Sequence, residues 1–158
     1  MDSELQTYVK QYEAATRRFE ELVSNLVEAD LDTKHQGGWS PRQIIHHVAD
    51  SEAQSYARIR RLIAEPIGSL IQGYDEAAWA ENPILGYEVL DISASMAVFS
   101  AVRASTLEIL KRLNESDLER HGEHSESGNY VVREWFEDYV AHPDDHGDQL
   151  KRALQGLL

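Results

Sequence analysis

The stretch Ser40–Leu62, SPRQIIHHVADSEAQSYARIRRL, predicts a helix with a defined beginning and one buried face. Ser40 is a favourable N-terminal cap, and Pro41 at the first helical position loses no N–H group that the helix needs. The residues of one stripe recur three or four positions apart: Ile44, His47, Val48, Ser51, Ser55, Ile59 and Leu62. We expect this helix to end near Glu65-Pro66 and to bury its stripe against other elements.

Three further segments show the same periodicity. The first carries Leu5, Tyr8, Val9, Tyr12, Phe19, Leu22, Val23 and Leu26, and another runs from Tyr87 or Asp91 to Leu113. The last begins near Tyr130 and carries Val132, Trp135, Phe136, Tyr139, His142, His146, Leu150 and Leu154. No segment has a convincing strand pattern. The sequence therefore predicts an all-α four-helix bundle, formed by one domain over residues 1–158.

Three connections separate these helices, and the first, Asp30–Trp39, contains Gly37-Gly38. Residues 66–90 form a long one between the second and third helices, and connections of this length are often functional. Within it, Tyr74–Ala80 is expected to form a short helix that presents Tyr74 and Trp79. The polar stretch Asn114–Asn129 precedes the last helix.

Composition limits the function. The net charge of −13 argues against nucleic acid or an anionic membrane as partner and suits a cation or a small neutral or basic substrate. Because the chain has no cysteine, any metal must be held by histidine, carboxylate and water. The polar beginning MDSELQTYVK has no apolar signal core, and no run approaches membrane-spanning length, so we expect a cytoplasmic protein.

Three histidines are the candidate metal ligands. His142 and His146 stand four residues apart in the apolar register of the last helix, and His47 occupies the stripe of the second, whereas His46 points about a quarter-turn away. Three imidazoles with an open position form a familiar catalytic metal site. The competing interpretation is that each is a core histidine bonded to a neighbour. The remaining histidines, His35, His121 and His124, fall in connections and are expected on the solvated surface.

Pro143 lies between the two histidines of the last helix and leaves two outcomes open. It lacks an N–H for the carbonyl of Tyr139 and disfavours helical geometry at His142. The helix either kinks with both histidines still converging, or a new helix starts at Pro143 and displaces His142. The apolar register continues across the break, which favours a kink.

Acidic and aromatic residues complete the candidate site. Asp50 and Asp145 are candidates for orienting the ligand imidazoles or for acting as a base, against the alternative that they are ordinary solvated charges. Tyr74 and Trp79 are expected to line the mouth of a pocket above the metal. Glu52 and Glu76 are cases similar to Asp50 and Asp145, with ordinary solvated charge as the favoured interpretation of each. Trp39 and Trp135 are expected in the core.

Three motifs resemble those of one known family. Gly38–Ser51 (GWSPRQIIHHVADS) resembles the GW-(S/T)-x-RQ-xxHH-(L/V)-AD-S signature of the DinB-like superfamily, in its YfiT-like branch. Tyr74–Ala80 (YDEAAWA) resembles the branch's YDE-x-x-WA segment, and Tyr139–His146 (YVAHPDDH) matches the position of its H-x-x-x-H helix. The resemblance runs from about residue 20 to the end of the chain.

The resemblance implies a four-helix bundle with a zinc or nickel ion held by His47, His142 and His146. It also implies a metal-dependent hydrolase, or a thiol S-transferase or isomerase that uses a low-molecular-weight thiol, and a homodimer. The segment Ala141–Gln149 (AHPDDHGDQ) departs from the family's basic, histidine-rich pattern. Its acidic surround weakens the inference of an anionic thiol cofactor more than that of a metal. A dimeric bundle with a vestigial or structural metal site is the non-catalytic alternative.

Overall fold

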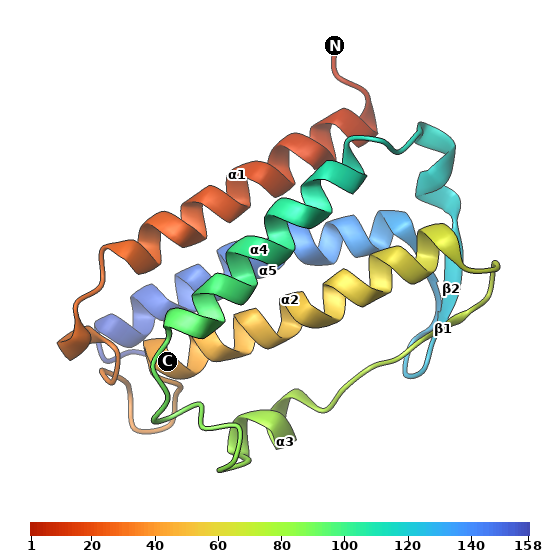
Figure 1. The fold of residues 1–158 in the computed structure, drawn as a ribbon. Coiled ribbons are helices and arrows are strands. Elements are labelled where there is room, and N and C mark those ends of the chain that lie inside the picture. The colour runs from red at the N-terminus through yellow and green to blue at the C-terminus, as the bar shows by residue number, and fades with distance from the viewer.

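Four long helices lie side by side in the computed structural model, which describes residues 1–158 (Figure 1). They are α1 (Glu4–Ser24), α2 (Pro41–Ala64), α4 (Ser93–Leu110) and α5 (Val132–Leu154). The predicted four-helix bundle is confirmed. The third long helix is shorter at both ends than the sequence suggested, and its first turn begins after Tyr87 and Asp91.

The long connection determines how the helices are oriented. Between α2 and α4 the chain runs back along the bundle, so α4 starts at the same end as α2 and runs parallel to it (Figure 1). Helices α1 and α5 are also parallel to each other and run in the opposite direction. The connection carries the short helix α3 (Glu76–Glu81), whose N-terminal cap Asp75 accepts a hydrogen bond from the Ala78 N–H at 3.0 Å. The expected short helix is therefore present, and it begins two residues and ends one residue later than predicted.

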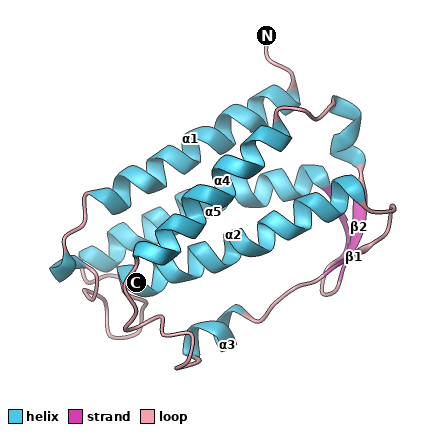
Figure 2. Cartoon of the chain, viewed as in Figure 1, coloured by secondary structure: helices cyan, strands magenta, loops and turns pink.

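The expectation of no strand was wrong, because a small sheet closes one end of the bundle (Figure 2). Strand β1 (Leu70–Ile71) pairs in parallel with β2 (His121–His124), and β2 pairs in antiparallel fashion with β3 (Gly128–Val131). These strands have two to four residues each and are too short to show an alternating apolar pattern. A Cβ atom on Gly122 would lie 2.7 Å from Ile71 Cγ1, so close pairing at that position requires glycine.

The sheet corrects two further expectations. Helix α5 begins at Val132 rather than near Tyr130, because Tyr130 belongs to β3. His121 and His124 belong to β2 and are half-buried, so they are not surface residues of a loop.

The beginning of α2 forms as the sequence predicts. Ser40 Oγ accepts a hydrogen bond from the Gln43 N–H at 3.2 Å, and Gln43 Oε1 accepts one from the Ser40 N–H at 2.9 Å. This reciprocal pair satisfies donors that the first helical turn leaves free, and Pro41 needs none. The helix start therefore holds His47 at a fixed position, two turns along the helix.

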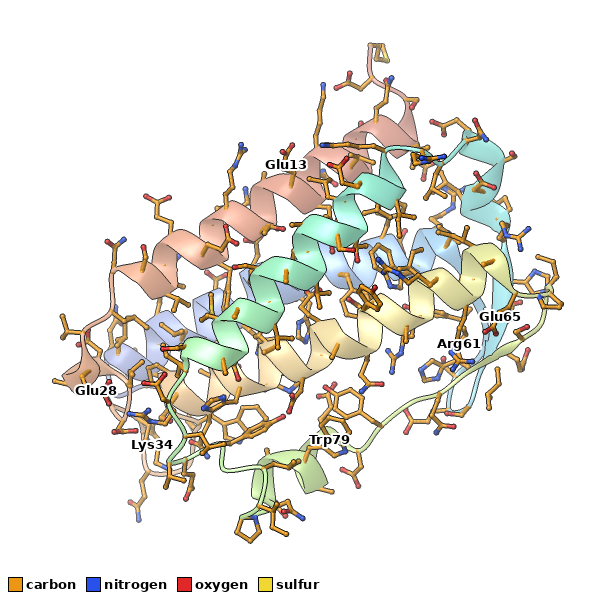
Figure 3. The ribbon with its side chains drawn as sticks, viewed as in Figure 1. Glu13, Glu28, Lys34, Arg61, Glu65 and Trp79 are labelled. Atoms are coloured by element: carbon orange, nitrogen blue, oxygen red, sulfur yellow. The ribbon has the colours of Figure 1, made fainter.

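The apolar core consists of two clusters. One contains Tyr12, Ile59, Leu110, Trp135 and Phe136, and the other contains Phe19, Ile44, Val48, Phe99 and Leu150. Charged side chains such as those of Glu13, Arg61 and Glu65 project outward (Figure 3). Each long helix passes from one cluster to the other, so the residues between the clusters form a layer across the bundle.

A buried ion pair occupies this middle layer. The side chains of Arg103 on α4 and Glu52 on α2 are both 0% exposed, and Arg103 Nη1 donates to Glu52 Oε1 at 2.9 Å. Arg103 Nη2 also donates to the Tyr12 carbonyl at 2.9 Å, and its Nε donates to Thr16 Oγ1 at 2.8 Å. Glu52 is thus not the solvated charge that the sequence suggested. A buried charge of this kind is tolerated only because it is paired and fully hydrogen-bonded.

Replacing Arg103 is expected to destabilise the bundle strongly. Arg103→Met leaves the Glu52 carboxylate buried without a partner, which costs about 3–5 kcal/mol of the free energy of unfolding. Adding Glu52→Leu removes that charge and is expected to restore part of the loss. Urea unfolding followed by circular dichroism measures both variants. A single variant within about 1 kcal/mol of the wild type would contradict the assigned role.

Candidate metal centre

Three imidazoles from two helices converge in the middle of the bundle. His47 comes from α2, His142 and His146 come from α5, and one ring nitrogen of each lies within 4.8 Å of the other two. The Nε2 atoms of His47 and His146 are 3.1 Å apart. Nitrogen ligands at about 2.0–2.1 Å from one tetrahedral zinc ion are about 3.4 Å apart. The widest spacing here therefore has to close by at most about 1.4 Å.

Helix α5 continues through Pro143, which answers the question that the sequence left open. The helix is unbroken from Val132 to Leu154, and His142 and His146 lie one turn apart with ring centroids separated by 4.3 Å. Pro143 leaves the Tyr139 carbonyl without its usual N–H donor. Arg103 Nη1 donates to that carbonyl at 2.7 Å instead. The buried guanidinium thus supports the turn of α5 that carries His142.

Burial keeps two of the imidazoles, those of His47 and His142, neutral. It lowers the pKa of His47 to about 4, and repulsion from a charged His146 adds to the effect. Burial also lowers the pKa of His142, with further contributions from His146 and His47. At neutral pH both rings therefore carry a free lone pair, which is the form that binds a metal ion.

The hydrogen bonds of the cluster suit metal ligands. The acceptor Gln149 Oε1 lies 2.7 Å from His146 Nδ1, and the Nε2 atom of His146 faces the other rings. The Nδ1 atoms of His47 and His142 are buried and have no partner. The protein alone thus leaves the cluster unsatisfied, and a divalent cation among neutral imidazole donors fits it.

His46 has a structural role. Its Nδ1 atom lies 2.7 Å from Ser95 Oγ, and its Nε2 atom lies 3.0 Å from the Leu90 carbonyl oxygen, so both nitrogens are occupied outside the cluster.

Trp135 is fully buried, as expected, but Trp39 is only partly buried. The Trp39 ring meets the His47 ring edge-on with centroids 5.3 Å apart, so it covers one side of the cluster.

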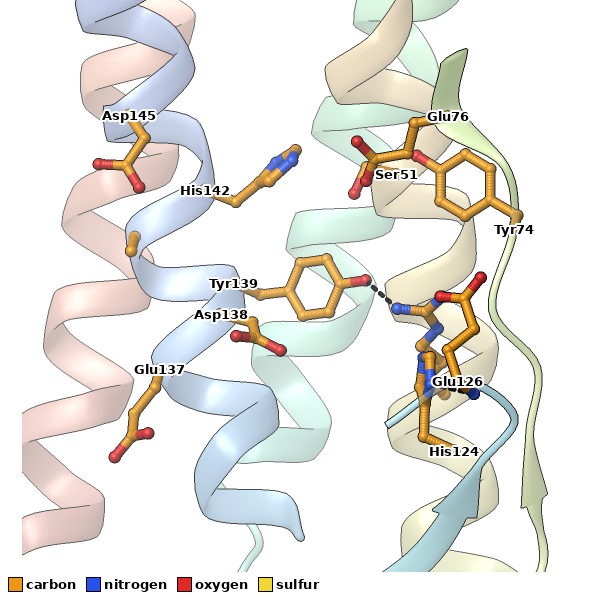
Figure 4. Close-up of a pocket in the computed structure, with 12 residues that line it drawn as sticks. Ser51, Tyr74, Glu76, His124, Glu126, Glu137, Asp138, Tyr139, His142 and Asp145 are labelled. Carbon is orange, nitrogen blue, oxygen red and sulfur yellow. Dashed lines mark hydrogen bonds between the residues drawn. The ribbon is translucent and has the colours of Figure 1, made fainter. Parts of the chain in front are cut away.

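Two cavities meet the cluster from different sides. A cavity of about 410 Å³ is lined by His142, and one of about 360 Å³ is lined by His47 and His146. Glu76, at the start of α3, lines both. Figure 4 shows the larger cavity between α5 on one side and α2 with its covering segment on the other. The candidate centre is therefore reachable from solvent, as a catalytic metal site requires.

The structure brings some predicted site residues to the larger cavity and not others. Tyr74 and Asp145 line it, and Trp79 supports Tyr74 through an edge-on contact with ring centroids 4.7 Å apart. Asp50 does not reach the cluster, because its carboxylate accepts a hydrogen bond from the Tyr87 hydroxyl. Sequence reasoning missed two residues that support the site, Gln149 and Arg103. Only Gln149 could have been found from the sequence, because it stands three residues after His146 on the same helix.

A family model for the DinB superfamily matches residues 11–150. The chain belongs to the DinB superfamily. A relative from Oceanobacillus iheyensis named "Putative metal-dependent hydrolase" is 33% identical over 140 residues, which cover 88% of this chain and 79% of the relative. A Bacillus cereus protein of the same name is 28% identical over 143 residues, with 90% and 80% covered.

Two solved structures of four-helix bundles resemble this one. Bacillus subtilis YfiT, described as "a probable metal-dependent hydrolase with an unusual four-helix bundle topology", superposes with a TM-score of 0.84 at 25% identity, covering 98% of this chain and 89% of YfiT. The protein TT2238 gives a TM-score of 0.64 at 20% identity, with 93% and 98% covered. The family and the fold predicted from the sequence motifs are thus confirmed. No helix has the length and apolar character needed to span a membrane.

Removing the partner of His146 is expected to weaken metal binding. Gln149→Ala frees the His146 Nδ1–H group and lets the ring change tautomer, so zinc affinity should fall about 10- to 100-fold. A competition titration with a chromogenic chelator measures this. The exposed Gln155→Ala, just beyond the end of the same helix, is the matched control and should bind zinc like the wild type. Equal affinity of the Gln149 variant would remove Gln149 from the site.

Proposed function

We propose that this DinB-superfamily protein is a metal-dependent hydrolase of a small molecule, with His47, His142 and His146 as the ligands of one divalent ion. The observation that carries the proposal is the convergence of three imidazoles where two cavities meet. The names of the relatives and of YfiT support it.

Zinc or nickel is the proposed metal. Imidazole nitrogens suit borderline divalent ions, whereas magnesium and calcium prefer oxygen ligands. The candidate set contains three nitrogens and no thiolate, because the chain has no cysteine. Three protein ligands leave a position for water or substrate, which is the arrangement of catalytic rather than structural zinc sites.

Glu76 is the proposed general base. When bound, the ion would polarise the electrophile and lower the pKa of water at the site. The Glu76 carboxylate lines both cavities and takes part in no ion pair. It would accept the proton of the attacking water as the water oxygen bonds to the carbonyl or phosphoryl centre. It would then return that proton to the leaving group as the bond between that centre and the leaving group breaks. The α3 helix on the long connection places Glu76 there.

Two tyrosine hydroxyls are proposed to stabilise negative charge that develops on the substrate. Burial raises the pKa of Tyr139 to about 12, so its hydroxyl is protonated at neutral pH. The Tyr139 oxygen accepts a hydrogen bond from Arg58 Nη1 at 3.1 Å, which leaves its own proton for another acceptor. Burial also raises the pKa of Tyr74, whose buried hydroxyl has no partner. Fixed donors of this kind lower the barrier to acyl or phosphoryl transfer.

Thiol transfer has less support than hydrolysis. The cavity beside His142 is lined by five carboxylates and one guanidinium, so an anionic thiol cofactor would be repelled. Hydrolysis needs only water as the second reactant.

The metal content of the purified protein tests the ligand assignment. Protein purified without a nickel column should contain close to one equivalent of zinc or nickel by elemental mass spectrometry, and His146→Ala should lose it. His35→Ala is the matched control, because His35 lies outside the cluster and its ring accepts a hydrogen bond only from the Gly37 N–H. No metal in the wild type, even after incubation with zinc, would contradict the proposal.

The role of Glu76 is tested by activity at constant metal content. With a panel of 4-nitrophenyl esters and phosphodiesters, Glu76→Gln should keep its metal and lose about 100-fold or more in kcat, since a neutral amide accepts no proton. Glu81→Gln, an exposed glutamate at the other end of α3, should be unaffected. Unchanged kcat in the Glu76 variant would exclude it as the base. A metal-loaded wild type inactive on the whole panel would favour a structural metal.

A further inference from the structure

The larger cavity is strongly acidic on the side away from the histidine cluster. Its volume of about 410 Å³ is large enough for a small organic molecule. Five carboxylates line it, namely Glu76, Glu126, Glu137, Asp138 and Asp145, against the single guanidinium of Arg58. They come from α3, from the turn between β2 and β3, and from α5. In Figure 4 the carboxylates of Glu76, Glu126 and Asp138 lie around this space, whereas those of Glu137 and Asp145 point away from it. The Glu137 carboxylate accepts a hydrogen bond from the Tyr8 hydroxyl on α1. Three separate elements thus still place like charges around one space.

These carboxylates have no ion-pair partner in the protein, although Asp138 accepts a hydrogen bond from the Tyr130 hydroxyl at 2.8 Å. None of the five forms an ion pair, although lysines and arginines elsewhere on the molecule form several. Arg58 donates from Nη1 to the Tyr139 hydroxyl and from Nη2 to the Gln72 carbonyl, each at 3.1 Å, so it is bound to neutral oxygens. Figure 4 shows Asp138 and Glu126 on opposite walls of the cavity. Like charges that face one space without a counter-ion favour a cationic ligand.

The walls also offer polar and aromatic groups to a ligand. The Tyr74 hydroxyl is buried without a hydrogen-bond partner, and in Figure 4 it points to the same space as the His142 ring. The rings of Tyr74 and Tyr139 line the cavity and have negative faces, which attract organic cations. A buried hydroxyl without a partner is costly unless a bound molecule satisfies it.

We propose that the substrate carries a positively charged organic group, a protonated or quaternary amine, and that the carboxylates of this cavity bind it. Glu126 and Asp138 hold the cation across the cavity, and the uncharged part of the substrate extends toward His142. The proposal rests on the proposed hydrolase function for the position of the reacting bond. Binding of the cation itself requires no metal and no turnover.

Choline and its uncharged isostere 3,3-dimethylbutan-1-ol are suitable probes. They have the same shape, and a quaternary ammonium group cannot coordinate a metal, so any difference reports charge recognition alone. Isothermal titration with zinc-loaded and with chelator-treated protein should show that choline binds both forms at least about tenfold more tightly than the alcohol. The preference should weaken as salt is raised. Equal affinity for the two probes, or no binding of choline, would overturn the proposal.

Variants assign the binding to this cavity. Glu126→Gln and Asp138→Asn should each weaken choline binding about threefold or more, and together more strongly. Glu21→Gln, an exposed carboxylate on α1, removes the same charge outside the cavity and should leave affinity unchanged. An equal loss in all three variants would mean non-specific attraction and would overturn the proposal. Choline binding that persists in a protein without metal or hydrolytic activity would refute the proposed function and leave the cation site standing.

Discussion

The ion pair between Arg103 and Glu52 is the interaction on which the rest of the structure depends. Both side chains are completely buried, and the guanidinium also bonds to Tyr12 and Thr16 on α1 and to the Tyr139 carbonyl on α5. One side chain of α4 thus contacts all three other long helices. Because a buried charge without partners is costly, the four helices can pack only in the arrangement that satisfies it. Apolar packing on either side of this layer is less selective about position.

The same network positions the candidate metal centre. Arg103 replaces the N–H that Pro143 removes and so keeps the turn of α5 before His142 regular. Glu52 links Arg103 to α2, the helix that carries His47. Glu52 lies about one and a half turns after His47 on that helix. The spacing of the three histidines therefore depends on a salt bridge that touches none of them. The long connection adds α3 and its Glu76 over the cluster, so stability and the proposed chemistry arise from adjacent layers of one bundle.

The sequence was sufficient for features that depend on local pattern. Ser40-Pro41 marked the start of α2, helical periodicity located four helices, and spacing placed His142 and His146 on one face with His47 on another helix. Features that depend on contacts between distant segments could not be predicted. The strands are short and are stabilised by their neighbours. The partner of the Tyr139 carbonyl, Arg103, lies 36 residues away in the sequence, on another helix. The acidic cavity likewise collects charges from three elements, each of which resembles ordinary solvated charge in the sequence.

Anomalous X-ray diffraction at the zinc absorption edge, from crystals of the zinc-loaded protein, tests the central claim most directly. We expect one strong peak, from the zinc ion, between His47, His142 and His146 at about 2.0–2.1 Å from a ring nitrogen of each. A peak among the carboxylates of the larger cavity, or no peak at the histidine cluster at saturating zinc, would contradict the central claim.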